Sequence, residues 1–176
     1  EPQETEIQPP KYDLPYRESQ VLGAEFVNKR EVPILSDADA VKFAAITKTP
    51  QVKFIMEIPA IKFSSPALYG QDVETILERG VLIFPGSKLD LDGEKIFLCY
   101  REYFNSNDSR SCWHLDKLSI GDEIIISNGE NKKIYNIIGK NIFNPEDKYI
   151  YQLSGMQNHI KIVTNYFVNG EYKRLV

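Results

Sequence analysis

The sequence has few of the residues that build metal sites and disulfide frameworks. Its 176 residues include two histidines and only two cysteines, Cys99 and Cys112. Two cysteines cannot form a disulfide scaffold or a zinc site of paired cysteines, so we predict no metal site and no cofactor. The two could bridge a short loop in an oxidising compartment or stay as separate thiols, and the sequence leaves both readings open.

An excess of positive charge and long apolar runs are also lacking. The formal net charge is −4 at pH 7, which argues against a nucleic-acid partner because phosphate binding usually needs a basic patch. No apolar run approaches the roughly 18 residues of a transmembrane helix, and no signal peptide is visible. Since the chain begins at Glu1 rather than Met, we expect a processed or trimmed piece whose membrane anchor lies outside it.

What the sequence does contain is a series of short β-rich segments. Residues 1–35 are polar and rich in proline, which indicates an extended arm or lid, and residues 36–176 form the expected domain. Helices are expected over 36–46 and 71–79. The expected strands are 52–58, 61–63, 67–69, 95–100, 122–127, 132–138, 149–153, 159–165 and 171–176. Many short strands with few helices predict a mainly β fold, a closed barrel of about eight strands.

Six segments, in this order, resemble the sortase family. They are Ile55–Ile61 (family pattern I-x-I-P-x-I), Asp72–Gly80, Phe84–Ser87, His114–Asp122 (LDKLKKGD), Ile160–Asn165 (L-T-L-x-T-C) and Arg174–Val176 (R-L-L-V). Sortases are membrane-anchored cysteine transpeptidases of bacterial cell surfaces, which hold a cleaved sorting signal as a thioacyl enzyme and pass it to an amine. The resemblance covers residues 50–176. It implies a sortase-like barrel, a location at the cell surface, and surface proteins or sorting-signal peptides as partners.

The resemblance also implies three catalytic positions, two of which hold other residues. The family cysteine falls on Asn165, and the histidine of the pattern A-G-H-R falls on Tyr100. The family arginine is retained as Arg174, nine residues after Asn165. A neutral amide forms no thioester, and tyrosine, with a reference pKa near 10 against about 6.5 for histidine, is a poor proton shuttle at neutral pH. Losing either residue costs several orders of magnitude in rate, and losing both costs little more.

The two cysteines are the other candidate nucleophiles of the chain. Cys99 is next to Tyr100, and neighbours on a strand point to opposite faces, so Cys99 faces away if Tyr100 faces the cleft. Cys112 and His114 share a face if their segment is extended, which would place a thiol near an imidazole.

In the N-terminal arm, Asp13–Tyr16 resembles the lid of some sortases.

Simpler structural roles are open for every one of these residues. Tyr100 and Asn165 could pack in a filled former cleft, and Arg174 could be a surface or core-edge arginine. His159 is expected to be a solvated edge residue. The acidic segment 90–94 matches the first half of a calcium loop without its closing acid, which favours an acidic turn.

The leading hypothesis is an inactive sortase-like domain that binds or scaffolds surface proteins or sorting-signal peptides. It would use the former substrate groove, with Arg174, Asn165 and Tyr100 at the floor of that groove. The alternative is an active cysteine transpeptidase with a non-standard site at Cys112 and His114. An engineered inactive form is disfavoured, because alanine or serine is the usual replacement. A purely structural role is favoured if the cleft is filled by side chains.

Overall fold

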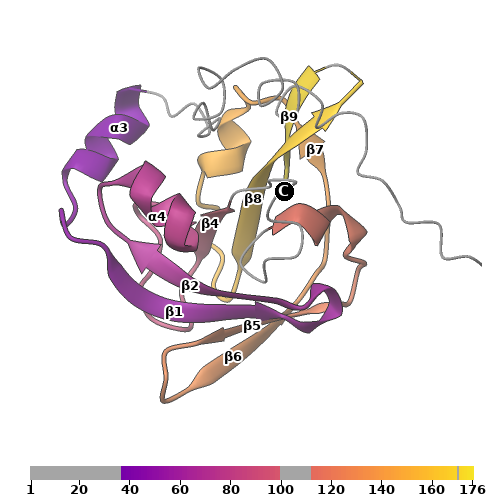
Figure 1. The fold of residues 1–176 in the computed structure, drawn as a ribbon, viewed down its shortest axis with the longest axis horizontal. Coiled ribbons are helices and arrows are strands. Elements are labelled where there is room, and N and C mark those ends of the chain that lie inside the picture. Colours follow the sequence, from indigo (N-terminus) through magenta and orange to yellow (C-terminus); the bar gives the residue numbers. More distant parts are fainter. Residues whose placement is uncertain (1–36, 100–111, 170) are drawn as a thin grey trace, which may run out of the picture.

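The protein is built around one curled β-sheet (Figure 1). The computed structural model describes residues 37–99, 112–169 and 171–176, so the expected arm over 1–35 lies outside the described residues. The strands are β1 (Gln51–Ile58), β2 (Phe63–Tyr69), β3 (Val81–Ile83), β4 (Lys95–Cys99), β5 (Glu123–Ser127), β6 (Lys132–Asn136), β7 (Ile142–Phe143), β8 (Ile160–Val168) and β9 (Glu171–Leu175). The helices are α3 (Asp37–Ala44), α4 (Val73–Arg79) and the 3₁₀ turns η2 (Pro59–Ile61), η4 (Cys112–Lys117) and η5 (Lys148–Tyr151).

The order of the strands is β6-β5-β1-β2-β3-β4-β8-β9-β7. The β2–β3 and β4–β8 pairs are parallel, and the other pairs are antiparallel. The expected mainly β fold is confirmed, with one difference in the barrel. It has nine strands, and β6 and β7 are sheet edges that do not pair with each other in the described chain, so a seam is open between them.

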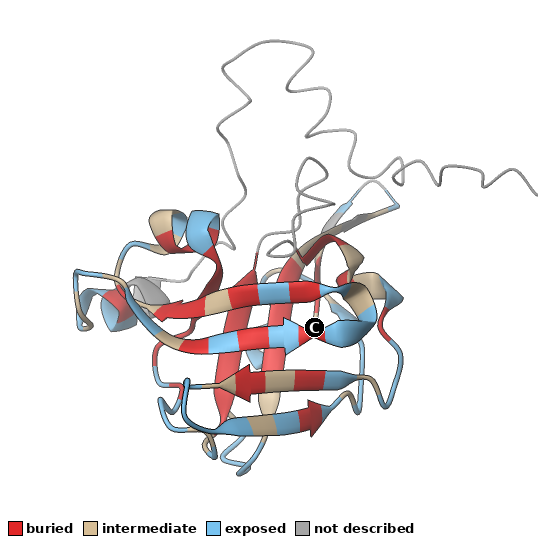
Figure 2. Cartoon of the chain, turned by 60° about the horizontal axis from the view of Figure 1, so that its bottom comes forward, coloured by how far each residue is buried: buried red, intermediate tan, exposed pale blue. Residues whose placement is uncertain are grey.

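Two hydrophobic cores lie on the two faces of the sheet. The inner core fills the curl with side chains such as Met56, Phe97 and Leu175. The outer core joins β3, β4 and β8 to α3, α4 and η5 through residues such as Ile76 and Ile150. Buried and exposed residues alternate along β1 and β6, as expected for strands with one solvated face (Figure 2). All of β3 and β4 is buried, because both of their faces are covered.

Two expectations about strands were wrong. The expected pieces 61–63 and 67–69 are not two strands, because Ile61 ends the turn η2 and Phe63 begins β2, which runs through Pro66 to Tyr69. Proline is tolerated there because the β2–β3 ladder begins one residue later, at Ala67, so that side of Pro66 needs no N–H donor. The expected strand 149–153 is instead the 3₁₀ turn η5, which begins where the Asp147 carboxylate accepts a hydrogen bond from the Tyr149 N–H at 3.0 Å.

Most of the remaining elements agree with the expected ones within a few residues, but the short strands β3 and β7 and the turns η2 and η4 were not expected. The helix α4 is capped by Asp72, whose carboxylate accepts from the Thr75 N–H at 3.0 Å. The hairpin β5–β6 has its expected turn, and β8 continues three residues beyond Asn165. Over the described residues, no helix has the length and apolar character needed to cross a membrane.

Candidate functional site

Two of the three expected site residues face each other across a strand pair. Asn165 on β8 is the ladder partner of Arg174 on β9. Directly opposed residues in an antiparallel pair have Cβ atoms roughly 4.5–5.5 Å apart, so the amide and the guanidinium stem are neighbours. Val163 on β8 and Val176 after β9 pack in the outer core, and side chains alternate along a strand. Asn165 and Arg174 are therefore on the outer face of the sheet.

Arg174 is buried, yet few of its hydrogen-bond donors are used. The side chain is 2% exposed, and its Nη1 donates to the Lys173 carbonyl at 3.1 Å. Its Nε is buried and has no hydrogen-bond partner, and no carboxylate pairs with the guanidinium within the described part of the chain. A guanidinium carries five N–H donors, and leaving buried donors unmet is costly. The site therefore offers strong donors to an incoming oxygen acceptor.

The third expected residue, Tyr100, lies outside the described residues. Asn165 is half-buried, so its amide has limited contact with solvent. What the structure brings together is Asn165 and Arg174.

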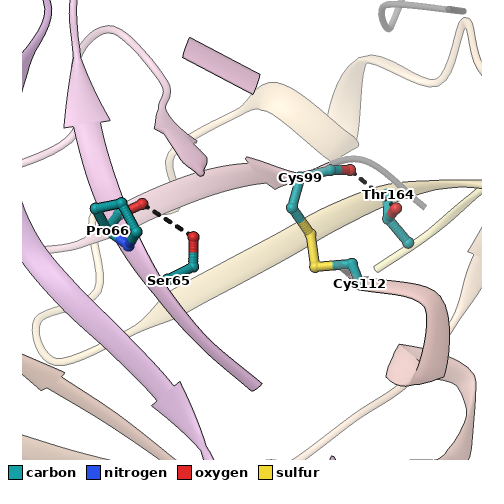
Figure 3. Close-up of a disulfide and its surroundings, with 5 residues drawn as sticks. All are labelled: Ser65, Pro66, Cys99, Cys112 and Thr164. Carbon is teal, nitrogen blue, oxygen red and sulfur yellow. Dashed lines mark hydrogen bonds between the residues drawn. A yellow bond between two sulfur atoms is a disulfide. The ribbon is translucent and has the colours of Figure 1, made fainter. Parts of the chain in front are cut away.

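Both cysteines of the chain are joined in one disulfide (Figure 3). Cys99 at the end of β4 and Cys112 at the start of η4 have Cα atoms 6.1 Å apart, and their sulfurs are bonded. Both side chains lie in the inner core, on the opposite face of the sheet from Asn165. The Thr164 hydroxyl donates to the Cys99 carbonyl at 2.9 Å and ties this end of β4 to β8. Since the sequence has only these two cysteines, the oxidised protein has no free thiol.

The expectation that Cys112 and His114 share a face was based on an extended segment, which was wrong. These residues belong to the 3₁₀ turn η4. At three residues per turn, positions two apart differ by about 120° in direction. The sulfur of Cys112 is also fully buried and committed to the disulfide. This segment therefore has neither the geometry for a thiol–imidazole pair nor a free thiol.

The last carboxylate of the acidic segment 90–94 is buried just before β4, which the sequence did not predict. Glu94 is 6% exposed, and its Oε1 accepts from the N–H and the hydroxyl of Ser154 at 2.7 and 2.6 Å. Its Oε2 accepts from the Gly155 N–H at 2.7 Å. Burial by itself raises the pKa of Glu94, but the hydrogen bonds from Ser154, Gly155 and His159 outweigh it and lower the pKa. Glu94 thus fastens the loop before β8 to the sheet.

This carboxylate also corrects the expectation for His159. Instead of a solvated edge residue, His159 is largely covered, and its Nδ1 is 3.4 Å from the Glu94 Oε1. The neighbouring acidic segment behaves as the expected turn, in which the Asp90 carboxylate accepts from the Gly93 N–H at 2.7 Å. No cluster of three or more metal-binding side chains occurs in the part of the chain that the structure describes.

The fold and the site can now be compared with known proteins. No family model matches the sequence, and no curated protein is significantly similar to it. Solved structures do match. Sortase C-3 from Streptococcus pneumoniae is 21% identical over 94% of this chain and 77% of its own, with a TM-score of 0.63.

Two further structures represent other sortases. Sortase C-1 from Actinomyces oris is 18% identical, with 94% of this chain and 95% of its own covered and a TM-score of 0.60. A lid mutant of sortase A from Corynebacterium diphtheriae is 20% identical over 73% of this chain and 69% of its own, with a TM-score of 0.60. At these identities the likeness concerns the fold. The nine-stranded curled sheet, with Asn165 and Arg174 paired on its outer face, is that of a protein with the sortase fold.

Proposed function

We propose that this chain is a sortase-like domain without transpeptidase activity, which binds an extended sorting-signal peptide or a surface protein. We place it outside the cytoplasm, at a bacterial cell surface and held by a membrane anchor. The observation that carries the proposal is Arg174, a buried guanidinium with unmet donors beside an amide at the nucleophile position.

The absence of a free thiol supports the loss of catalysis. Asn165 cannot form the thioacyl intermediate on which the sortase reaction depends. The two cysteines that the chain does have are paired with each other in the inner core. Disulfides persist in oxidising compartments, so this pair also supports a location outside the cytoplasm.

Arg174 favours a binding role over a purely structural one. A structural arginine at a core edge is usually paired with a carboxylate or has its donors met by several carbonyls. Among the described residues, the Arg174 side chain donates one hydrogen bond, to the carbonyl of its own neighbour Lys173. An extended peptide presents carbonyl oxygens at regular spacing and can present a carboxylate, either of which suits a guanidinium fork.

The test is binding of fluorescently labelled sorting-signal peptides, measured by anisotropy. Substitution Arg174→Lys keeps the charge but loses the planar fork, and we expect about tenfold weaker binding, the equivalent of one charge-assisted hydrogen bond. The matched control is Arg79→Lys at the exposed end of α4, which should bind like the unsubstituted protein. Peptide binding that both substitutions leave unchanged would exclude Arg174 from the site.

A cleavage assay separates this proposal from the alternative of an active enzyme. Peptide and an amine acceptor are incubated with the protein, with and without a reductant, and products are followed by mass spectrometry. We expect no cleavage in either condition. Turnover that appears on reduction and disappears in Cys112→Ser would establish the relocated thiol instead.

A further inference from the structure

A cavity of about 550 Å³ opens at the seam of the barrel, between the sheet edge β6 and strand β8. Its size is within the roughly 300–1,000 Å³ range of small-molecule sites. Neither Asn165 nor Arg174 lines it, so it is separate from the peptide site proposed above. It forms where β6 and β7 fail to close the barrel, and it lies next to the inner core.

The floor of the cavity is apolar and continues into an exposed apolar rim. Leu118, Ile162 and Leu175 of the inner core line its depth. Large apolar side chains around the mouth are exposed to an unusual degree, with Ile134 at 47% and Ile138 at 77%. Exposed apolar side chains at the mouth of a concave site are typical of a ligand-binding site.

The charged side chains of the wall are lysines. Lys133, Lys140 and Lys161 line the cavity beside His159, whereas no aspartate or glutamate side chain does. This contrasts with the net charge of −4 of the chain. Lys133 is neutralised by an ion pair with Asp92, just outside the lining, and His159 lies against Glu94.

Neither of the other two lysines forms an ion pair in the described chain, although the charge of Glu94 acts on Lys161. The Lys140 ammonium donates to the backbone carbonyls of Asp116 and Leu118 at 2.6 and 2.8 Å. The buried Lys161 ammonium likewise donates to two backbone carbonyls, one of them that of Tyr149, and lies 4.1 Å from the centre of the Tyr149 ring. Each ammonium has three N–H donors and uses two of them here. Each is therefore held in place and keeps one donor for a further acceptor.

We propose that this seam cavity binds a single-chain anionic amphiphile, taken up as a monomer. Its apolar chain would lie over Leu118, Ile162 and Leu175, and its carboxylate would meet the Lys140 ammonium, which is held at the Leu118 carbonyl. The apolar floor favours a chain, and the Lys140 ammonium, which has no carboxylate partner in the described chain, favours a negative head. A neutral or cationic ligand would leave this charge uncompensated.

The first experiment compares ligands on the unsubstituted protein. Dodecanoate, kept below its micelle concentration, is titrated by calorimetry against dodecanol and dodecyltrimethylammonium, which have the same chain with a neutral or a positive head. We expect saturable dodecanoate binding at one site, about tenfold weaker dodecanol binding, and no binding of the cation. Equal binding of the three ligands, or no saturable dodecanoate binding, overturns the proposal. Binding only to dodecanoate-containing vesicles and not to the monomer also overturns it.

The second experiment places the ligand in the cavity. Substitution Lys140→Gln should weaken dodecanoate about tenfold and leave dodecanol unchanged, because only the charged head uses the ammonium. The matched control is Lys148→Gln, an exposed lysine outside the lining, which should change neither affinity. Substitution Ile138→Glu, at an exposed position of the rim, should weaken dodecanoate by at least about tenfold through charge repulsion. A dodecanoate affinity that neither substitution changes would locate the amphiphile elsewhere.

Discussion

Two buried ionic side chains of this protein are satisfied to very different degrees. Glu94 accepts three short hydrogen bonds from Ser154 and Gly155. Arg174 donates one hydrogen bond and keeps a buried Nε without a partner in the described chain. A fully satisfied buried charge stabilises its surroundings, whereas an under-satisfied one is available to a ligand. We therefore assign Glu94 to stability and Arg174 to binding.

Substitution Glu94→Gln tests the first of these roles. We expect the free energy of unfolding at pH 7 to fall by about 2–3 kcal/mol, because an amide cannot accept at both positions and one buried donor loses its partner. Chemical denaturation measures this loss. The exposed Glu130→Gln in the β5–β6 turn is the control and should change little.

The same pair of proteins should differ in their pH dependence. The pKa of Glu94 is lower in the folded protein than its reference value of 4.5. Its contribution to stability is thus complete above that value and is lost as the pH falls through the lowered pKa. The difference between the native protein and Glu94→Gln should shrink at acidic pH, and a difference that is constant from pH 7 to pH 3 would contradict this account.

The Cys99–Cys112 disulfide closes a short loop of the chain. The cysteines are 13 residues apart, and a loop of about this length is stabilised by roughly 3 kcal/mol when it is closed. Adding a reductant should therefore lower the denaturation midpoint of the native protein. The double variant Cys99→Ala and Cys112→Ala should be less stable and insensitive to reductant. A midpoint that reductant leaves unchanged in the native protein would show that the bond contributes nothing.

At the scale of secondary-structure elements, the close approach of α4 to β2 limits which residue can end the helix. Gly80 follows α4, and a Cβ added there would lie 2.3 Å from the Pro66 carbonyl oxygen. Its backbone is extended, so the close contact with backbone, and not the conformation, requires glycine. The parallel β2–β3 pair starts at this point, where Ala67 meets Val81.

Substitution Gly80→Ala should lower the free energy of unfolding by about 1–3 kcal/mol, because backbone must move to admit the methyl group. Thermal or chemical denaturation measures it. Gly139→Ala is the control, because an added Cβ there has no neighbour closer than 3.7 Å. That variant should be neutral or slightly stabilising through reduced freedom of the unfolded chain. Equal effects of the two substitutions would refute the contact argument.

At the scale of the whole molecule, burial is greatest in the middle of the sheet. The strands β3 and β4 are covered on both faces, by the inner and outer cores. The strands β6 and β7 are edges beside the open seam, and β6 carries exposed Ile134. Edge strands expose unpaired backbone groups and are held by fewer buried contacts.

Native-state hydrogen exchange should reflect this gradient. We expect the amides of β3 and β4 to exchange only by global unfolding, and those of β6 to exchange at least about tenfold faster through local opening. Mass spectrometry of peptides covering each strand measures the rates. If β6 is as protected as β4, the seam is closed in solution, and the cavity at the seam would be inaccessible.

The sequence by itself determined the fold class and most of the strands, and its choice of site residues stays a prediction. The segments that resemble sortases place Asn165 and Arg174 in neighbouring strands, and the structure pairs them directly. Local patterns suffice for this because alternation, turn residues and caps act within a few residues. The same local reasoning failed for residues 149–153, where the Asp147 cap favours a 3₁₀ turn over a β-rich pattern.

The tertiary structure decided what depends on residues distant in the sequence. The disulfide forms because the end of β4 and the start of η4 meet in the inner core. Glu94 is buried because a loop 60 residues away provides its donors. The burial of Arg174 and the open seam follow from how the sheet curls, since strand order and curvature depend on the packing of both cores.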